Sequence, residues 1–235
     1  MSKAVQADRS IAGGKGEAVR PEVTRRNFLS QGAVLTSAAA LAPAVLWPSR
    51  AEAQGFGGNQ TRLNFQDIQR HENDHVRFLV DALGAAARPK PTFQGLVQSN
   101  FRAFFKVSQD LENTGVGAYL GAAPAIFSPQ ILAAAGSIAL IEGRHAGWLN
   151  TLVNARLTEN VFGEEQSFER ALTPAEVRAL AGPFFASLNG GPPVDYDPDP
   201  MNASPANDIA ILNFALALEY LEAEFYNLNV PLFAR

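Results

Sequence analysis

The chain has 235 residues, 47% of them hydrophobic, and carries 19 Lys+Arg against 23 Asp+Glu. Its net charge of −4 gives no electrostatic support for nucleic-acid binding, which requires concentrated basic residues. The sequence has three histidines and no cysteine. Disulfide frameworks, thiolate metal sites and cysteine nucleophiles are therefore excluded, and any metal ion must be held by carboxylates and imidazoles.

The first 53 residues have the pattern of an export signal. The pair Arg25-Arg26 precedes a weakly apolar stretch of small residues over 28–47, and Ala51-Glu52-Ala53 matches the A-x-A cleavage pattern. Prolines interrupt the stretch and its hydrophobicity is mild, so it predicts a twin-arginine signal rather than a transmembrane helix.

This interpretation divides the chain into a signal peptide, residues 1–53, and one domain, residues 54–235. Removal of the signal would leave 12 basic and 19 acidic residues and a net charge of −7. We expect the twin-arginine machinery to export the protein to the periplasm or the cell exterior, with no membrane association once the signal is removed.

The periodicity of apolar residues predicts two long helices in the first half of the domain. The first is expected over about 62–84 and ends at Gly84, because a proline pair follows closely. The second is expected over about 97–120, with Phe101, Phe104 and Phe105 directed inward and Gly121 as its stop.

Two further long helices are expected in the second half. Ser128-Pro129 is an N-cap followed by a first-turn proline, and it begins a helix over about 129–153. Thr173-Pro174-Ala175-Glu176 has the form of a capping box that starts a short helix. The last helix is expected over about 208–228. Because no useful alternation of apolar and polar residues occurs, the predicted class is all-α.

Two of the three histidines follow a glutamate by three residues, as Glu72-x-x-His75 and Glu142-x-x-His145. Residues three apart are neighbours on a helix, so each pair shares one side. The other two long helices each carry a glutamate seven positions before a tyrosine, which is two turns. These pairs are Glu112 with Tyr119 and Glu219 with Tyr226, and each tyrosine is expected to hydrogen-bond a carboxylate of the site.

Glu-x-x-His on two helices and one glutamate on each of two others are the parts of a four-helix dimetal carboxylate site. Two divalent ions close together need several negative oxygens, some bridging, and one nitrogen each. We therefore predict two divalent ions, Fe or Mn, bound by Glu72, His75, Glu112, Glu142, His145 and Glu219. Glu222, three residues after Glu219, is either a substitute or an additional ligand.

Three segments resemble the exported ferritin-like, desiccation-related family. They are the helix sequence LNFALALEYLEAEFY at 212–226, ENTGVGAYLGAAP at 112–124 and IEGRHA at 141–146. The resemblance covers about 61–155 and 206–228. It implies a ferritin-like four-helix bundle and redox or stress-protective chemistry toward oxygen or peroxide. The residues alone reach only a dimetal site and leave open whether the protein is an oxidoreductase.

The order of helices departs from that family, because the helix that comes first there comes last here. The bundle would then need two long crossovers, over 85–96 and 156–206. Twelve extended residues can span about 40 Å, whereas a 20-residue helix is about 30 Å long. The sequence leaves open whether the last helix closes its own bundle or, by swapping in a homodimer, that of a second chain.

Two alternatives remain at this point. His71-Glu72-Asn73-Asp74-His75 also matches H-E-x-x-H, the motif of zinc metalloproteases, in which His71 and His75 would bind zinc. A ferritin-like site should instead tolerate replacement of His71. The second alternative is a structural or interaction bundle without metal, in which the Glu/His pairs satisfy one another.

Overall fold

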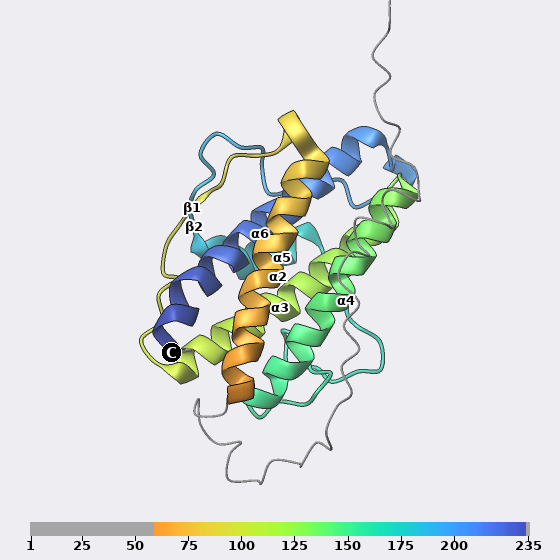
Figure 1. Ribbon diagram of the computed structural model, residues 1–235. Coiled ribbons are helices and arrows are strands. Elements are labelled where there is room, and N and C mark those ends of the chain that lie inside the picture. The colour runs from red at the N-terminus through yellow and green to blue at the C-terminus, as the bar shows by residue number, and fades with distance from the viewer. Residues whose placement is uncertain (1–58, 234–235) are drawn as a thin grey trace, which may run out of the picture. The chain divides into compact units, whose positions relative to one another are not determined.

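A computed structural model describes residues 59–233 of the chain, and four long helices dominate it. Their bounds are α2 (Asn59–Leu83), α3 (Phe101–Ala122), α4 (Pro129–Leu152) and α6 (Pro205–Phe233). α2 packs chiefly against α6, and α3 against α4 (Figure 1). The predicted all-α class and helical bundle are confirmed.

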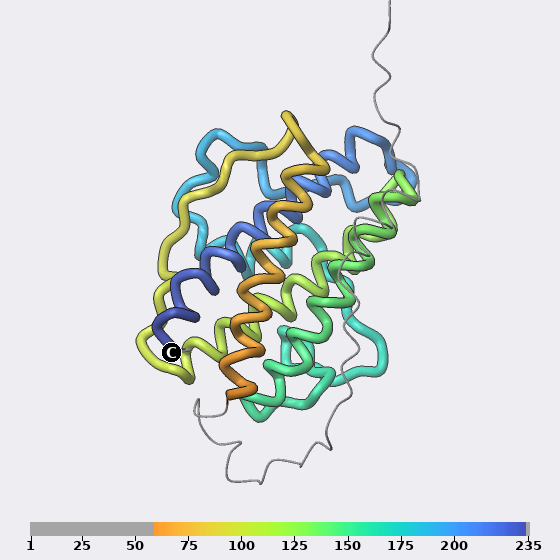
Figure 2. Tube along the Cα trace, viewed as in Figure 1, coloured from red at the N-terminus to blue at the C-terminus, as the bar shows by residue number. Residues whose placement is uncertain are grey.

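The helix directions follow from the two long connections. α2 and α3 run one way along the bundle, and α4 and α6 run the other way (Figure 2). Hydrogen bonds fix the antiparallel pairing of α2 and α6, because Gln69 bonds Asn227 near one end while Asn213 bonds the Ala86 carbonyl at the other. In this structure the last helix packs against α2 of its own chain.

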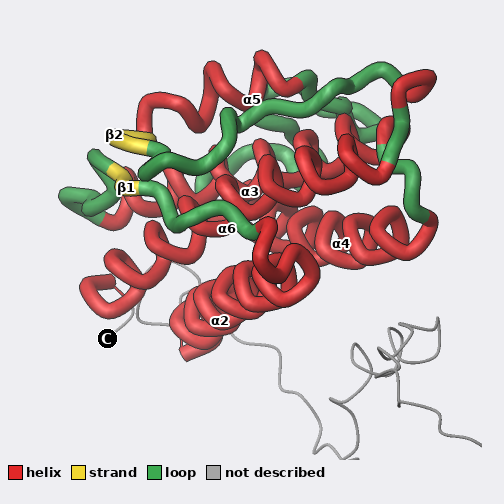
Figure 3. The backbone as a smooth tube through the Cα atoms, turned by 90° about the horizontal axis from the view of Figure 1, so that it is seen from above, coloured by secondary structure: helices red, strands yellow, loops and turns green. Residues whose placement is uncertain are grey.

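Both crossovers carry short elements of their own. The connection from α2 to α3 contains β1 (Thr92–Phe93), and the connection from α4 to α6 contains α5 (Pro174–Ala181) and β2 (Phe185–Ser187). β1 and β2 pair antiparallel, so the two crossovers meet beside the bundle (Figure 3). This small sheet was not predicted, because neither strand is long enough to show an alternating pattern.

Several predicted helix starts depend on side-chain caps, and those caps are present. Ser128 accepts a hydrogen bond from the backbone of Ile131, and Thr173 with Glu176 forms the complete capping box. The second long helix begins at Phe101, four residues later than predicted, because Asn100 is its N-cap and accepts from the Ala103 backbone. The last helix begins and ends outside the predicted 208–228.

Two expectations about the second helix are wrong. Phe101 is 45% exposed instead of facing inward, whereas Phe104 is fully buried. Gly121 does not stop the helix, which continues through Ala122 into a short 3₁₀ turn. Gly121 instead lies where Leu172 of the second crossover packs on α3, and a Cβ there would collide with the Leu172 carbonyl.

None of the described helices is long and apolar enough to cross a membrane. The expected signal peptide and its cleavage position lie outside the described residues.

Candidate metal centre

Each long helix places a buried glutamate at the centre of the bundle, and α6 places a second one, Glu222. On α2 the apolar residues Phe65 and Leu79, two turns to either side, belong to the core, and this packing directs the carboxylate inward. The four side chains are at most 1% exposed: Glu72, Glu112, Glu142 and Glu219. Four buried carboxylates are costly unless cations or hydrogen-bond donors compensate them.

The carboxylates and imidazoles form two groups that share two members. Glu112 and His145 complete one group, and His75 and Glu219 complete the other; within each group the candidate ligand atoms lie within 4.8 Å of one another. Glu72 and Glu142 belong to both groups. All six residues predicted as ligands are therefore brought together, in an arrangement that can hold metal ions.

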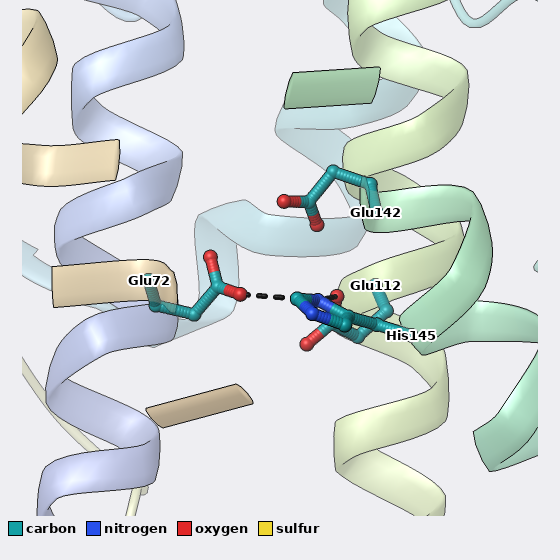
Figure 4. A group of neighbouring side chains, drawn as sticks. All are labelled: Glu72, Glu112, Glu142 and His145. Atoms are coloured by element: carbon teal, nitrogen blue, oxygen red, sulfur yellow. Dashed lines mark hydrogen bonds and ion pairs between the residues drawn. The ribbon is translucent and has the colours of Figure 1, made fainter. Parts of the chain in front are cut away.

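Both imidazoles present Nδ1 to the carboxylates. His145 Nδ1 lies 2.9 Å from Glu112 Oε2 and 3.2 Å from Glu72 Oε1, and Figure 4 shows these side chains converging from three helices. His75 Nδ1 lies 3.1 Å from Glu72 Oε2 and 3.2 Å from oxygens of Glu142 and Glu219. Each histidine is thus positioned to offer one nitrogen to the space that the carboxylates enclose.

The two tyrosines hold carboxylates across the bundle. Tyr119 on α3 donates its hydroxyl hydrogen to Glu219 Oε1 on α6 over 2.5 Å. Tyr226 on α6 donates to Glu112 Oε1 on α3 over 2.6 Å. Each tyrosine bonds the glutamate of the facing helix rather than the one on its own helix. One oxygen of each carboxylate is therefore fixed, and the other is directed to the histidine side.

The acid–base properties of the cluster reflect burial of like charges. Burial, followed by the negative charge of Glu112, raises the pKa of Glu72 to about 7, and burial raises the pKa of Glu142 well above its usual range. Burial opposes protonation of His145, but Glu112, Glu72 and Glu142 together outweigh it and raise the His145 pKa to about 11. Protons bound to these carboxyl and imidazole groups therefore reduce the negative charge of the cluster, and metal ions can replace those protons.

The donor set fits divalent metal ions. Both oxygens of Glu142 are buried without a hydrogen-bond partner among the described residues, although Oε1 lies near His75. Such oxygens are ready to bind a cation, and a shared carboxylate between two sites is the arrangement that bridges two ions. Oxygen ligands with one imidazole per ion suit Fe and Mn.

His71 lies outside both groups. Its Nδ1 is 2.9 Å from His145 Nε2, the nitrogen that faces away from the carboxylates, and the planes of the two rings are 7° apart. His71 and His75 are therefore not brought to one metal position, as the zinc metalloprotease arrangement requires. The position of His71 behind a candidate ligand could not be predicted from spacing on one helix.

Glu222 is buried next to the two groups but belongs to neither. Burial raises its pKa well above the usual range, and the negative charges of Glu142 and Glu112 add to the effect. Its spacing of three residues from Glu219 on α6 was the signal that identified it in the sequence.

Comparison with known proteins gives a family and no individual relative. No curated protein and no solved structure matches the chain. A model of the ferritin-like domain matches residues 17–155 and 207–233, which include all six predicted ligands and omit the second crossover with α5. The matched segments make up well over half of the chain, which therefore belongs to the ferritin-like domain family.

Proposed function

We propose that this protein is an exported dimetal protein that binds two Fe or Mn ions in its bundle. In this proposal Glu112 and His145 would hold one ion and Glu219 and His75 the other, and Glu72 and Glu142 would be available to both. The observation that carries the proposal is the sharing of Glu72 and Glu142 between two complete donor groups. Glu142 Oε2, which is buried without a hydrogen-bond partner among the described residues, also supports it.

A bound pair of Fe or Mn ions would supply redox chemistry toward oxygen or peroxide. The chain contributes buried carboxylates and restrained ligands, since Tyr119 and Tyr226 hold one oxygen each of Glu219 and Glu112. We infer a protective role against oxidants outside the cytoplasm, of the kind that the resemblance to the desiccation-related family implies. Peroxide consumption by the loaded protein would distinguish an oxidoreductase from a passive metal binder.

Metal analysis of purified protein tests the site. We expect about two ions per chain in the wild type and a loss of at least one in both Glu142→Ala and His145→Ala. Glu224→Ala is the matched control, because Glu224 is on α6 but pairs with Lys90 on the surface. Less than about half an ion per chain, unchanged by either substitution, would leave the metal-free bundle as the better description.

The export route is proposed from residues 24–53. Lysine at both Arg25 and Arg26 should prevent export, because the twin-arginine machinery reads the arginine pair. Cell fractionation checks this, and N-terminal sequencing of the exported form should begin at Gln54. Unchanged export of the double lysine variant would contradict the proposed route.

A further inference from the structure

A hollow of about 590 Å³ lies between the two crossovers and α6, and it shares no residue with the metal centre. Its size is in the range of small-molecule sites. Most of its lining is apolar and includes Pro192, Pro193 and Ile209. The two prolines belong to the second crossover, which lies outside the segments that match the ferritin-like domain. The hollow is therefore a feature of this chain's crossover rather than of the matched bundle.

Arg88 lies beside this hollow and has a buried guanidinium with an unpaired edge. The residue is 2% exposed, and its Nε and Nη2 have no hydrogen-bond partner among the described residues. Asn213, which lines the hollow, holds the rest of Arg88. The Asn213 side chain accepts from the Arg88 backbone over 2.7 Å, and the Asn213 carbonyl accepts from Nη1 over 3.4 Å. Because arginine stays charged, an unpaired buried guanidinium is costly unless an anion joins it.

The two unpaired nitrogens of Arg88 are a pair that can bind a carboxylate. Nε and Nη2 donate from the same edge of the planar guanidinium, and this edge matches the two oxygens of a carboxylate. A Cβ on residue 191 would lie 3.1 Å from Nη2, so Gly191 leaves the edge free of a side chain. Gly191 directly precedes Pro192 in the lining of the hollow. This turn covers the edge, and two successive glycines, Gly190 and Gly191, allow it to yield to a ligand.

Tyr196 offers a second unpaired donor. It lines the hollow and packs edge-on against Phe214, but its hydroxyl is buried without a hydrogen-bond partner among the described residues. Burial, with the nearby charge of Asp195, raises the Tyr196 pKa to about 12, so the hydroxyl stays protonated. Asp195 is itself paired with Arg178 over 2.6 Å. One uncompensated positive charge with donors around it suits a singly charged anion better than a doubly charged phosphate.

From this arrangement we propose that the hollow binds a small organic acid, whose carboxylate pairs with the Nε/Nη2 edge of Arg88 and whose apolar part lies against Pro192 and Ile209. The Tyr196 hydroxyl is a further donor to the ligand. The site is separate from the metal centre, so this inference stands or falls independently of the proposed dimetal function.

Calorimetric titration of the full chain with hexanoate, hexanamide and hexyl phosphate tests the site, with a chelator present so that no metal ion holds the anion. We expect hexanoate to bind with a Kd of about 1 mM or tighter, and the other two compounds to bind at least about tenfold more weakly. Arg88→Gln should lower the affinity for hexanoate at least about tenfold. Arg88→Lys should also weaken binding, because an ammonium group cannot present a two-donor edge.

Ile209→Glu is a second variant that keeps Arg88. Ile209 is 47% exposed on α6, so this substitution should preserve folding while it places a negative charge at the hollow, and hexanoate binding should be lost. Leu232→Glu is the matched control, because Leu232 is on the same helix, is 46% exposed and is not part of the lining. It should bind hexanoate as the wild type does.

Three results would overturn the inference. The first is no hexanoate binding by the wild type, or equal binding of hexanoate and hexanamide. The second is an unchanged affinity for hexanoate in Arg88→Gln, which would show that Arg88 has only a structural role. The third is tighter binding of hexyl phosphate than of hexanoate, which would replace the carboxylate by a phosphate as the ligand group.

Discussion

At the scale of single residues, His145 is a candidate ligand whose second ring nitrogen, Nε2, also has a hydrogen-bond partner. Its Nδ1 faces Glu112, while its Nε2 lies 2.9 Å from His71 Nδ1. The other nitrogen of His71 lies 3.2 Å from the Arg70 guanidinium, so His71 is itself restrained. A partner on the outer nitrogen fixes the ring orientation and tautomer of a ligating imidazole.

The contact with His145 changes the expectation from the sequence that replacement of His71 is tolerated: we expect His71→Ala to weaken metal binding without abolishing it. The loss of an outer partner lowers metal affinity by about tenfold to a hundredfold, whereas loss of His75 removes a candidate ligand itself. Titration of the metal-free variants with Mn²⁺ measures both effects. His71→Gln should recover part of the affinity, because an amide can still bond His145 Nε2.

Two outcomes would contradict this expectation. Wild-type affinity in His71→Ala would show that the contact with His145 has no influence on the site. Equal and complete metal loss in His71→Ala and His75→Ala would instead favour the zinc metalloprotease arrangement, in which both histidines are ligands.

At the scale of elements, the second crossover packs closely on α3 at two glycines, Gly117 and Gly121. The Leu172 backbone nitrogen donates to the Gly117 carbonyl over 2.9 Å, and the Leu172 side chain is buried against α3. Gly117 and Gly121 are one turn apart and leave a shallow face for this contact. The crossover connects the parallel helices α4 and α6. A connection of this length is needed because the helix that comes first in the resembled family comes last here, and the packing on α3 holds the crossover in place.

Replacing Gly121 by alanine should destabilise the protein. The new Cβ would collide with backbone atoms of Leu172, which cannot rotate away as a side chain can. Overpacking of this kind costs about 1–3 kcal/mol, or roughly 2–12 °C in Tm for a domain of this size. Thermal unfolding followed by circular dichroism measures the change.

Gly136→Ala is the matched control for this substitution. Gly136 is an exposed helix-interior glycine on α4, and a Cβ there would meet no atom within 4 Å. Alanine should therefore be neutral or stabilise the helix by up to about 1 kcal/mol. If both variants changed Tm equally, the contact between Gly121 and Leu172 would not be the cause.

Local rules on single helices predicted much of this arrangement. The Glu-x-x-His spacing identified residues that converge, and Ser128 and Thr173 are caps that neighbouring positions define. Features that depend on contacts between distant segments were not predictable: the bond from His71 to His145, the exchange of tyrosine partners between α3 and α6, and the role of Gly121. Phe101 was misplaced for the same reason, since periodicity identifies a helix face but not how far its neighbours cover it.

At the scale of the whole molecule, the buried cluster couples folding to protonation, and metal ions at the proposed site would compete with these protons. Glu72 has its pKa raised from 4.5 to about 7, so its contribution to stability is complete below about 4.5 and is lost as the pH rises through 7. His145, raised from 6.5 to about 11, contributes fully below 6.5 and loses its contribution toward pH 11. Both effects lower stability as the pH rises, that of Glu72 mainly below pH 7 and that of His145 between about pH 6.5 and pH 11.

The metal-free protein should therefore become less stable between pH 7 and pH 9. His71, whose pKa is lowered to about 4, is neutral in both the folded and unfolded states over this range and does not offset the trend. Metal ions displace the protons, so the stabilisation by saturating Mn²⁺ should grow with pH, by about 1.4 kcal/mol per pH unit for each proton released. Unfolding by urea at pH 7, 8 and 9, with chelator and with Mn²⁺, measures both trends.

A metal-induced stabilisation independent of pH would mean that the ions bind away from this protonated cluster. Loss of the trend in Glu142→Ala together with His145→Ala would locate the coupling at the shared carboxylate and its neighbouring imidazole.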